Sequence, residues 1–178
     1  QKLQRIYDPE KKLLLVTGHR RENMGAGFSE LIEALRELAS EPSIQVIYPL
    51  HMNPAVREPM IHALGNTEGI FLIEPLGYEA FVWLMSKSFL IISDSGGVQE
   101  EAPSLNKPVL VLREQTERQE AVEAGTVKLI GTLKEAIVQE VRELMVNKEA
   151  YLGMTQKSNP YGDGMAAKRI VDFLAASE

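Results

Sequence analysis

Apolar runs alternate with amphipathic helical segments along nearly the whole 178-residue chain, and this alternation is what most constrains its fold. Six runs have the length and composition of strands: 13–17, 44–48, 70–73, 89–92, 108–112 and 127–130. Segments with helical spacing of apolar residues separate and follow them: 28–39, 54–64, 78–85, 97–102, 116–124, 132–147 and about 164–175. The alternation predicts an α/β fold, a Rossmann-like parallel sheet with helices on both faces.

Composition narrows the class of protein. Hydrophobic residues make up 44% of the chain, and we expect residues 1–178 to form a single domain. A net charge of −6 without a long basic run argues against a nucleic-acid partner. No apolar stretch has the length of a membrane span, and the absence of cysteine excludes disulfides and thiolate chemistry. These features predict a cytoplasmic protein with no membrane partner.

The strand at 89–92 runs into Ser93-Asp94-Ser95-Gly96-Gly97 and then into a helical segment. The start of a helix presents unpaired backbone N–H groups, and glycines allow an anion to approach them closely. Glu100 and Glu101 follow one turn later, where a carboxylate can accept hydrogen bonds from sugar hydroxyls. The layout is typical of a nucleotide-diphosphate site. An ordinary strand-to-helix turn with Ser95 as a capping residue is the alternative.

Other polar residues also follow predicted strands, at the edge where ligands bind in such sheets. His19 and Arg20 follow the first strand, and they belong either to an anion site or to a solvated loop. His51 follows the second strand as a ligand or acid/base candidate, or as a residue that caps the next helix. Arg118 follows the fifth strand and can reach a phosphate or form a surface ion pair.

Two further features are ambiguous. Tyr78 and Phe81 lie three residues apart on a predicted helix, where a ring can stack on a base or pack in the core. The turn cluster at 159–164 carries no chemistry by itself. The three histidines show no metal-ligand spacing, so no metal site is predicted.

Taken together, these segments resemble one family, the non-hydrolysing UDP-N-acetylglucosamine 2-epimerases. The matching stretches follow the family's order and span nearly the whole chain: 17–23, 49–54, 75–81, 93–101, 113–125 and 159–164. The sequence departs from the family's pattern at Gln115 and Gln119, where threonine and proline are expected. The departure concerns the local shape of the segment 113–118, which we call the Arg118 loop.

The resemblance implies one half of a GT-B-type two-domain fold, with this chain as the carboxyl-terminal, UDP-binding half and the amino-terminal domain absent. It implies that Ser95, Gly96 and Gly97 bind the diphosphate, that Glu101 binds the ribose and that Phe81 faces the uracil. It implies a role in catalysis for His19 and a place near the phosphates or sugar for Arg118. Arg20 and His51 are implied near an allosteric nucleotide-sugar site, with His51 alternatively facing the catalytic cleft. The helix after Asn159 is expected to pack across the hinge of the longer protein.

The family interconverts UDP-GlcNAc and UDP-ManNAc by eliminating UDP and adding it back. The resemblance implies UDP and UDP-N-acetylhexosamine as ligands, no metal or nicotinamide cofactor, and a homodimer as the full-length enzyme. Its acid/base carboxylates belong to the amino-terminal half, so the chain is expected to be inactive alone. A glycosyltransferase donor domain and a stand-alone nucleotide-sugar sensor remain alternatives. The chain begins at Gln1 rather than at methionine, which favours part of a longer protein over a sensor.

Overall fold

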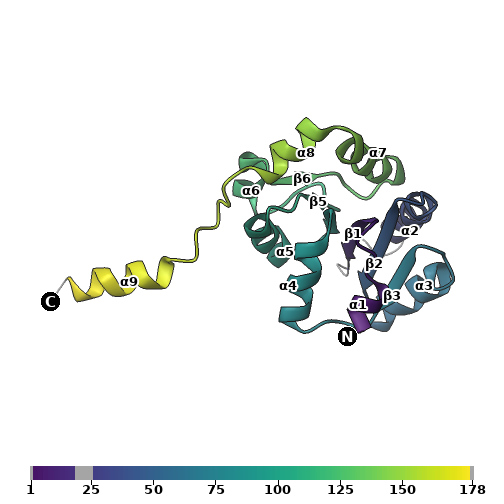
Figure 1. Cartoon of the computed structure of the whole chain (residues 1–178), viewed down its shortest axis with the longest axis horizontal. Helices are drawn as coiled ribbons and strands as arrows, with labels where there is room; N and C mark the ends of the chain where they lie inside the picture. The colour runs from purple at the N-terminus through teal and green to yellow at the C-terminus, as the bar shows by residue number, and fades with distance from the viewer. Residues whose placement is uncertain (1, 19–25, 177–178) are drawn as a thin grey trace.

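The computed structural model describes residues 2–18 and 26–176, which build a six-stranded sheet between two layers of helices (Figure 1). The strands are β1 (Lys12–Thr17), β2 (Ile44–Pro49), β3 (Ile70–Ile73), β4 (Leu90–Ser93), β5 (Val109–Val111) and β6 (Val127–Leu129). They lie in the order β3-β2-β1-β4-β5-β6, and each neighbouring pair is parallel. This is the doubly wound order of a Rossmann fold, so the predicted fold class is confirmed.

Alternating side chains of the strands feed two separate cores. In β1, Leu14 and Val16 join one buried cluster, whereas Leu13 and Leu15 join the other. The first cluster is covered by what we call the α2 layer: α2 (Ala26–Ala39), α3 (Pro54–Leu64), α7 (Lys134–Val146) and α8 (Lys148–Thr155). The second is covered by the α5 layer: α1 (Lys2–Ile6), α4 (Tyr78–Lys87), α5 (Gly96–Glu101), the 3₁₀ turn η2 (Ala102–Leu105) and α6 (Gln119–Ala124).

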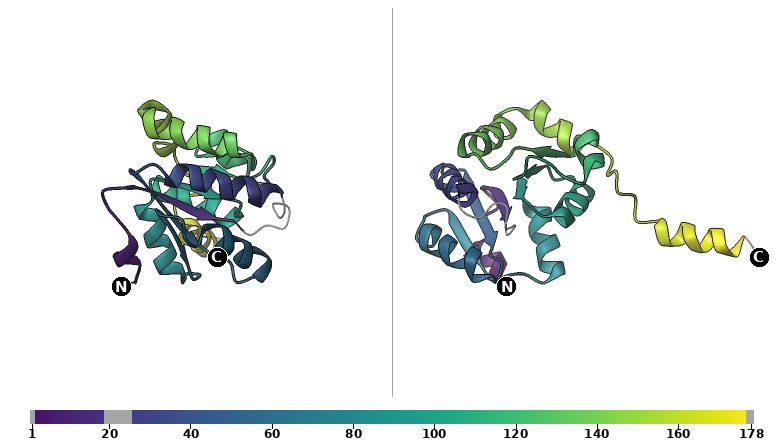
Figure 2. Two further views of the ribbon diagram at one scale, coloured as in Figure 1. Left: turned by 90° about the vertical axis from the view of Figure 1, so that its right-hand side faces the viewer. Right: turned by 180° about the vertical axis from the view of Figure 1, so that it is seen from behind.

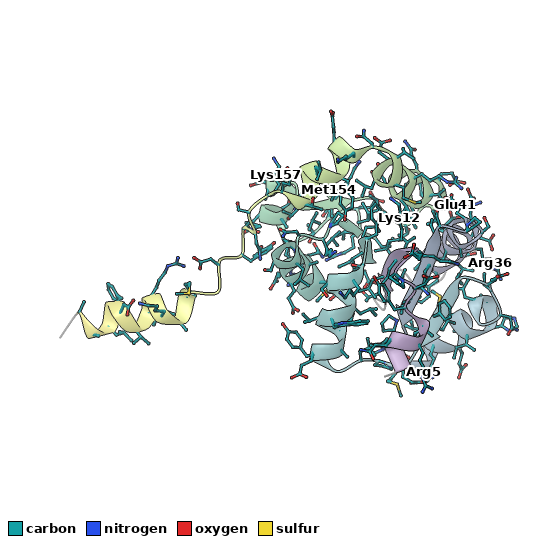
Figure 3. The ribbon with its side chains drawn as sticks, viewed as in Figure 1. Arg5, Lys12, Arg36, Glu41, Met154 and Lys157 are labelled. Carbon is teal, nitrogen blue, oxygen red and sulfur yellow. The ribbon has the colours of Figure 1, made fainter. Side chains whose placement is uncertain are left out.

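Helix α8 was not predicted, and long-range contacts explain why it forms. The ring of Tyr151 stacks on Phe89 at a centroid distance of 4.6 Å, and its hydroxyl donates to the Phe89 carbonyl at 2.9 Å. The ammonium of Lys12 lies 4.2 Å from the centroid of the Phe89 ring on the same core. Figure 3 labels Lys12 and, on α8, Met154. The short helix α1 was also not predicted.

Some predicted helix limits shift in the structure. Helix α6 begins at Gln119 rather than at residue 116, and α2 begins at Ala26, two residues before its predicted start. Leu133 was expected on the buried face of its helix. It is instead the N-cap of α7, with 62% of its surface exposed, and Ile137, Val141 and Leu144 form the buried face.

Helix α9 (Ala166–Ala175) ends the described part of the chain and extends away from the sheet, as Figures 1 and 2 show. None of its residues is buried. Its large apolar side chains are all more than half exposed: Ile170, Val171, Phe173 and Leu174. The helix therefore contributes nothing to either core.

Candidate functional site

The chain changes direction across the sheet between β1 and β4, and in doubly wound sheets ligands bind beyond the carboxyl ends of the strands at such a point. Thr17 and Ser93 are paired in register there, and their hydroxyl oxygens lie 2.6 Å apart. The Ser93 hydroxyl also accepts a hydrogen bond from the Ser95 backbone N–H at 3.0 Å. The end of β1 is thus tied to the first turn after β4.

Gly18 directly follows β1 at this edge of the sheet, and two buried polar side chains lie close to it. The Tyr48 hydroxyl donates to the Gly18 carbonyl at 2.8 Å. A Cβ atom at Gly18 would lie 3.1 Å from that hydroxyl and 3.8 Å from a carboxylate oxygen of Asp94. Burial, and then the charge of Asp94, raise the pKa of Tyr48 above its usual range, so the hydroxyl remains a donor. Predicted site residues His19 and Arg20 lie outside the described residues.

The glycine turn opens α5, but Ser95 does not cap the helix with its side chain. Its backbone conformation is that of an N-cap, with no side-chain capping hydrogen bond in the described part of the chain. This geometry disfavours the alternative in which Ser95 serves only as a cap. Gly96 is buried and Gly97 is exposed, so the backbone at Gly97 is open to a ligand.

Arg118 reaches across from the segment after β5 and lies over Gly96. A Cβ atom at Gly96 would lie within 3 Å of its guanidinium group, so a larger residue at this position would displace the Arg118 side chain from the turn. The Nε and Nη2 atoms of Arg118 each lie 2.9 Å from the Glu100 carboxylate, and Nη1 pairs with Glu117. Arg118 therefore forms the ion pairs that one alternative predicted, and it also lies beside the glycine turn.

Glu117 supports this arrangement from the same loop. Its carboxylate accepts a hydrogen bond from its own backbone N–H and another from Arg113 at 2.9 Å. These interactions, with the Arg113 and Arg118 charges, lower the pKa of Glu117 to about 2. The carboxylate therefore stays ionised across the physiological range and holds two arginines at the carboxyl edge of the sheet.

Glu101 faces the other side of the glycine turn. One of its carboxylate oxygens lies 3.9 Å from the position that a Cβ atom would take at Gly97. The Tyr78 hydroxyl hydrogen-bonds to Glu101, and the Glu101 charge, more than the bond itself, raises the pKa of Tyr78. The two adjacent carboxylates are thus divided, with Glu100 paired to Arg118 and Glu101 turned toward α4.

A buried contact that the sequence did not predict joins α5 to the Arg118 loop. Gln99 is fully buried, and its side-chain oxygen accepts a hydrogen bond from the Thr116 hydroxyl at 2.8 Å. The same hydroxyl accepts from the Arg118 backbone N–H at 3.2 Å. This role for Thr116 explains why α6 starts three residues later than predicted. A polar pair of this kind gives no local signal, since neither residue stands out in its own segment.

Phe81 and His51 both line one cavity at the carboxyl ends of β1, β2 and β3. A cavity of about 280 Å³ is lined by Thr17, Gly18, Pro49, Leu50, His51, Met52, Pro75, Leu76 and Phe81. Phe81 is half-buried and also packs against the α5-layer core, so both of its predicted roles are compatible with its position. His51 is exposed, and its Nδ1 atom accepts from the Asn53 N–H at 3.1 Å, while Asn53 itself caps α3.

Two searches of the described residues bear on other kinds of function. In residues 2–18 and 26–176, no group of three or more His, Cys, Asp or Glu side chains is arranged to hold a metal ion. No helix in the same part of the chain combines the length and apolar composition that crossing a membrane requires.

Comparison with known proteins identifies the family. Residues 1–175 match the family model described as UDP-N-acetylglucosamine 2-epimerase. The enzyme of that name from Escherichia coli K12 is 54% identical over 170 residues, which cover 95% of this chain and 45% of the E. coli protein. A Campylobacter jejuni protein of the same name is 54% identical over 165 residues, which cover 92% of this chain and 43% of that protein. The chain therefore spans slightly less than half the length of these relatives.

Solved structures agree with the sequence comparison. The UDP-GlcNAc 2-epimerase from Neisseria meningitidis bound to UDP-GlcNAc superimposes with a TM-score of 0.92 at 47% identity, covering 98% of this chain and 47% of that one. The glycosyltransferase WaaG shares the fold alone, with a TM-score of 0.66 at 16% identity over 97% of this chain and 49% of that one. With the match of residues 1–175, these similarities show that the chain belongs to the UDP-N-acetylglucosamine 2-epimerase family.

Proposed function

We propose that this chain is the UDP-binding half of an enzyme that interconverts UDP-GlcNAc and UDP-ManNAc. The observation that carries the proposal is the convergence of the Ser95–Gly97 turn, Arg118 and Glu101 on one edge of the sheet. The turn offers backbone amides and Arg118 offers a cation, which together suit a diphosphate. Glu101, on the other side of the turn, suits the ribose hydroxyls.

The cavity lined by Phe81 and His51 supports the placement of the base. Phe81 contributes an aromatic face, and the remaining lining is mostly apolar. A flat uracil ring gains from contact with such a face, and its polar edge can reach backbone groups at the strand ends. We therefore assign Phe81 to the uracil and Ser95, Gly96 and Gly97 to the diphosphate.

The proposed reaction proceeds through elimination and readdition. Loss of the C2 proton and cleavage of the C1–O bond release UDP and leave a 2-acetamidoglucal. Protonation of C2 on the other face and re-formation of the C1–O bond then give the epimer. The leaving UDP carries the developing charge, so amides and Arg118 at the diphosphate would lower the barrier by stabilising that charge.

Three further assignments rest on the family resemblance. His19 is assigned to catalysis, and Arg20 and His51 to a second, allosteric nucleotide-sugar site. His51 borders the cavity that also contains Phe81, which supports the alternative that it faces the catalytic cleft.

We also propose that the working enzyme contains an amino-terminal domain that supplies the acid/base carboxylates, and that it is a cytoplasmic homodimer. The coverage of 45% of the E. coli enzyme supports a missing half. The exposed apolar side chains of α9 support its packing against that half. The absence of cysteine is in keeping with a reducing compartment.

Calorimetric titration of the chain with UDP, with uridine as the control, tests the nucleotide site. We expect saturable binding of UDP and much weaker binding of uridine, because the amides and Arg118 contact only the diphosphate. Equal affinity for the two ligands would reject the diphosphate assignment. Absence of UDP binding at millimolar concentration would mean that the nucleotide site is not complete within these residues.

An assay of epimerisation tests the division of labour. The isolated chain should not convert UDP-GlcNAc to UDP-ManNAc, whereas the longer protein should. Transfer of the sugar to an acceptor by the longer protein, without epimerisation, would favour the glycosyltransferase alternative. The family match over residues 1–175 favours the epimerase, since the similarity to WaaG extends to the fold alone.

A further inference from the structure

The segment 156–164, which we call the strap, connects α8 to α9 and runs along the surface of the α5 layer. Figure 1 shows it leaving the domain beside α6, and Figure 3 labels Lys157 near its start. The strap and η2 together line a groove that includes Ser104, Asn159 and Asp163. The strap contains the turn cluster that carries no chemistry by itself.

Asn159 ties the strap to the end of α5 through a single side chain. Its Nδ2 atom donates to the Glu100 carbonyl at 3.3 Å and to the Ser104 hydroxyl at 2.6 Å. Its Oδ1 atom accepts from the Tyr161 backbone N–H at 3.1 Å and closes the turn of the strap. One half-buried amide therefore joins α5, η2 and the strap.

Glu100, whose carbonyl accepts the hydrogen bond from Asn159, also binds Arg118 through its carboxylate. The Glu100 carboxylate makes the two 2.9 Å contacts with the Arg118 guanidinium, which in turn lies on Gly96. Glu100 thus has its backbone fixed by the strap and its side chain engaged at the glycine turn. Any shift of α5 relative to the Arg118 loop must strain one of these contacts.

Tyr161 adds a second contact between the strap and this loop. Its hydroxyl group bonds to the backbone of Ala121 in α6 and faces the charges of Glu120, Glu100 and Arg118. The strap therefore touches both elements between which Arg118 is held, α5 through Asn159 and α6 through Tyr161.

We propose that Asn159 is a positioning residue for the diphosphate site, holding α5 at Glu100 so that Gly96 and Arg118 keep the spacing that a diphosphate needs. The inference rests on the proposed function, because it concerns the same nucleotide site. It makes the affinity for UDP depend on the position of the strap. Whatever displaces the strap then weakens the hold on the diphosphate.

The proposed link between the strap and the diphosphate site does not extend into α9. Asp163 pairs with Arg169 at 2.6 Å and accepts from the Met165 N–H at 3.0 Å, and both contacts stay within the terminal segment. Helix α9 has no buried residue. Removal of residues 165–178 should therefore leave UDP binding intact, whereas removal of residues 157–178 should weaken it.

The test uses the 178-residue chain and two ligands, UDP and uridine. Asn159→Ala removes the donor to Glu100 and the turn acceptor together. Asn159→Asp keeps the acceptor for the Tyr161 N–H but places a carboxylate against the Glu100 carbonyl. Asp163→Asn is the matched control in the same strap, and Ser104→Ala removes one acceptor without altering the strap. Circular dichroism checks that each variant is folded.

We expect Asn159→Ala and Asn159→Asp each to weaken UDP binding by about three- to tenfold, the loss of one or two hydrogen bonds. Uridine binding should change by less than about twofold, and Asp163→Asn should match the wild type. Wild-type affinity for UDP in Asn159→Asp would overturn the role of the Glu100 contact. Equal losses for UDP and uridine would indicate a merely structural role and overturn the inference.

The wild-type titration separates this inference from the proposed function. A wild-type chain that binds UDP no better than uridine overturns the diphosphate assignment, and the role of Asn159 falls with it. A wild-type chain that prefers UDP, with unchanged Asn159 variants, overturns only the role of Asn159. If Asn159→Ala does not fold, UDP affinity is measured instead in Ser104→Ala and in the two truncated chains. The inference is overturned if Ser104→Ala binds UDP as the wild type does and the two truncated chains bind UDP equally well.

Discussion

The two layers of helices cover the same sheet but differ in what they contain. The cluster under the α2 layer has 23 buried apolar residues in the described part of the chain, against 12 under the α5 layer. The α5 layer instead contains the buried Gln99–Thr116 pair and the glycine turn. Apolar burial is the main source of stability, whereas polar groups at a strand end are what a ligand recognises. The comparison indicates that the α2 layer mainly supports the fold, and under the proposed function the α5 layer mainly binds the nucleotide.

The largest effect should come from a cavity in the α2 layer. Leu35 lies on α2 and is fully buried in the larger cluster. Leu35→Ala should cost about 2–5 kcal/mol of unfolding free energy, because transfer energy is lost and a void remains. Denaturant unfolding measures this loss. UDP affinity of the variant that remains folded should match the wild type, and a parallel loss of affinity would break the proposed division.

Glu101→Ala is the complementary change in the α5 layer. The proposed contact with ribose predicts a loss of roughly 1–3 kcal/mol in UDP binding, since one or two hydroxyls would lose a charged acceptor. Unfolding free energy should hardly change, because Glu101 is outside both cores. Calorimetry with UDP and with 2′,3′-dideoxy-UDP separates the contribution of the ribose hydroxyls to binding from that of the rest of the nucleotide. If the analogue lacking the hydroxyls distinguishes wild type from variant as strongly as UDP does, Glu101 does not bind ribose.

Tyr48→Phe tests the boundary between the layers. Tyr48 belongs to the larger core, yet its hydroxyl donates to the carbonyl of Gly18, which lines the cavity beside Phe81. Removing the hydroxyl should cost about 1 kcal/mol of stability, the net value of one hydrogen bond. UDP affinity should fall as well, because Gly18 lines the cavity proposed for the uracil. A change in stability without a change in UDP affinity would mean that the Tyr48 hydroxyl contributes to the fold and not to UDP binding.

The sheet was predictable from the sequence because each strand shows its pattern locally. The order of strands and the clustering at their carboxyl ends follow from the rules for parallel sheets. Helix α8 was missed since its formation depends on Tyr151 meeting Phe89, 62 residues away. Such a contact has no local signal, although Asn147 is a favourable N-cap whose side chain accepts a hydrogen bond from the Ala150 N–H at 3.0 Å.

The sequence predicted several residues of the candidate site, but it did not predict the contacts between them. Ser95, Gly96, Arg118 and Glu101 were expected at one edge, and the structure brings them together there. The division of labour between Glu100 and Glu101 was not predictable, because adjacent carboxylates look alike in a sequence. It depends on which of them faces Arg118 and which faces Tyr78. Gln99 and Asn159 were missed because their roles also depend on partners that are distant in the sequence.

The smallest effect should come from the ion pairs between α2 and α7, on the surface of the α2 layer. Glu37 lies 2.9 Å from Lys134 and 2.9 Å from Arg142, while Arg142 also pairs with Glu41 at 2.8 Å; Figure 3 labels Glu41 at this edge. The hydrogen bonds from Lys134 and then from Arg142 lower the pKa of Glu37 below its usual range.

A carboxylate with a lowered pKa stabilises the folded state above its unfolded pKa, and that contribution is lost as the pH falls through the folded pKa. Glu37→Gln should therefore be slightly less stable than the wild type at pH 7, and the difference should shrink as the pH falls below about 4.5 and disappear below the folded pKa of Glu37. High salt at pH 7 should reduce the difference too, since these groups are exposed to solvent. Thermal unfolding of both proteins at several pH values measures it. A difference that persists at low pH would mean that Glu37 acts through packing rather than charge, and the surface of the α2 layer would then contribute to the fold in the same way as its core.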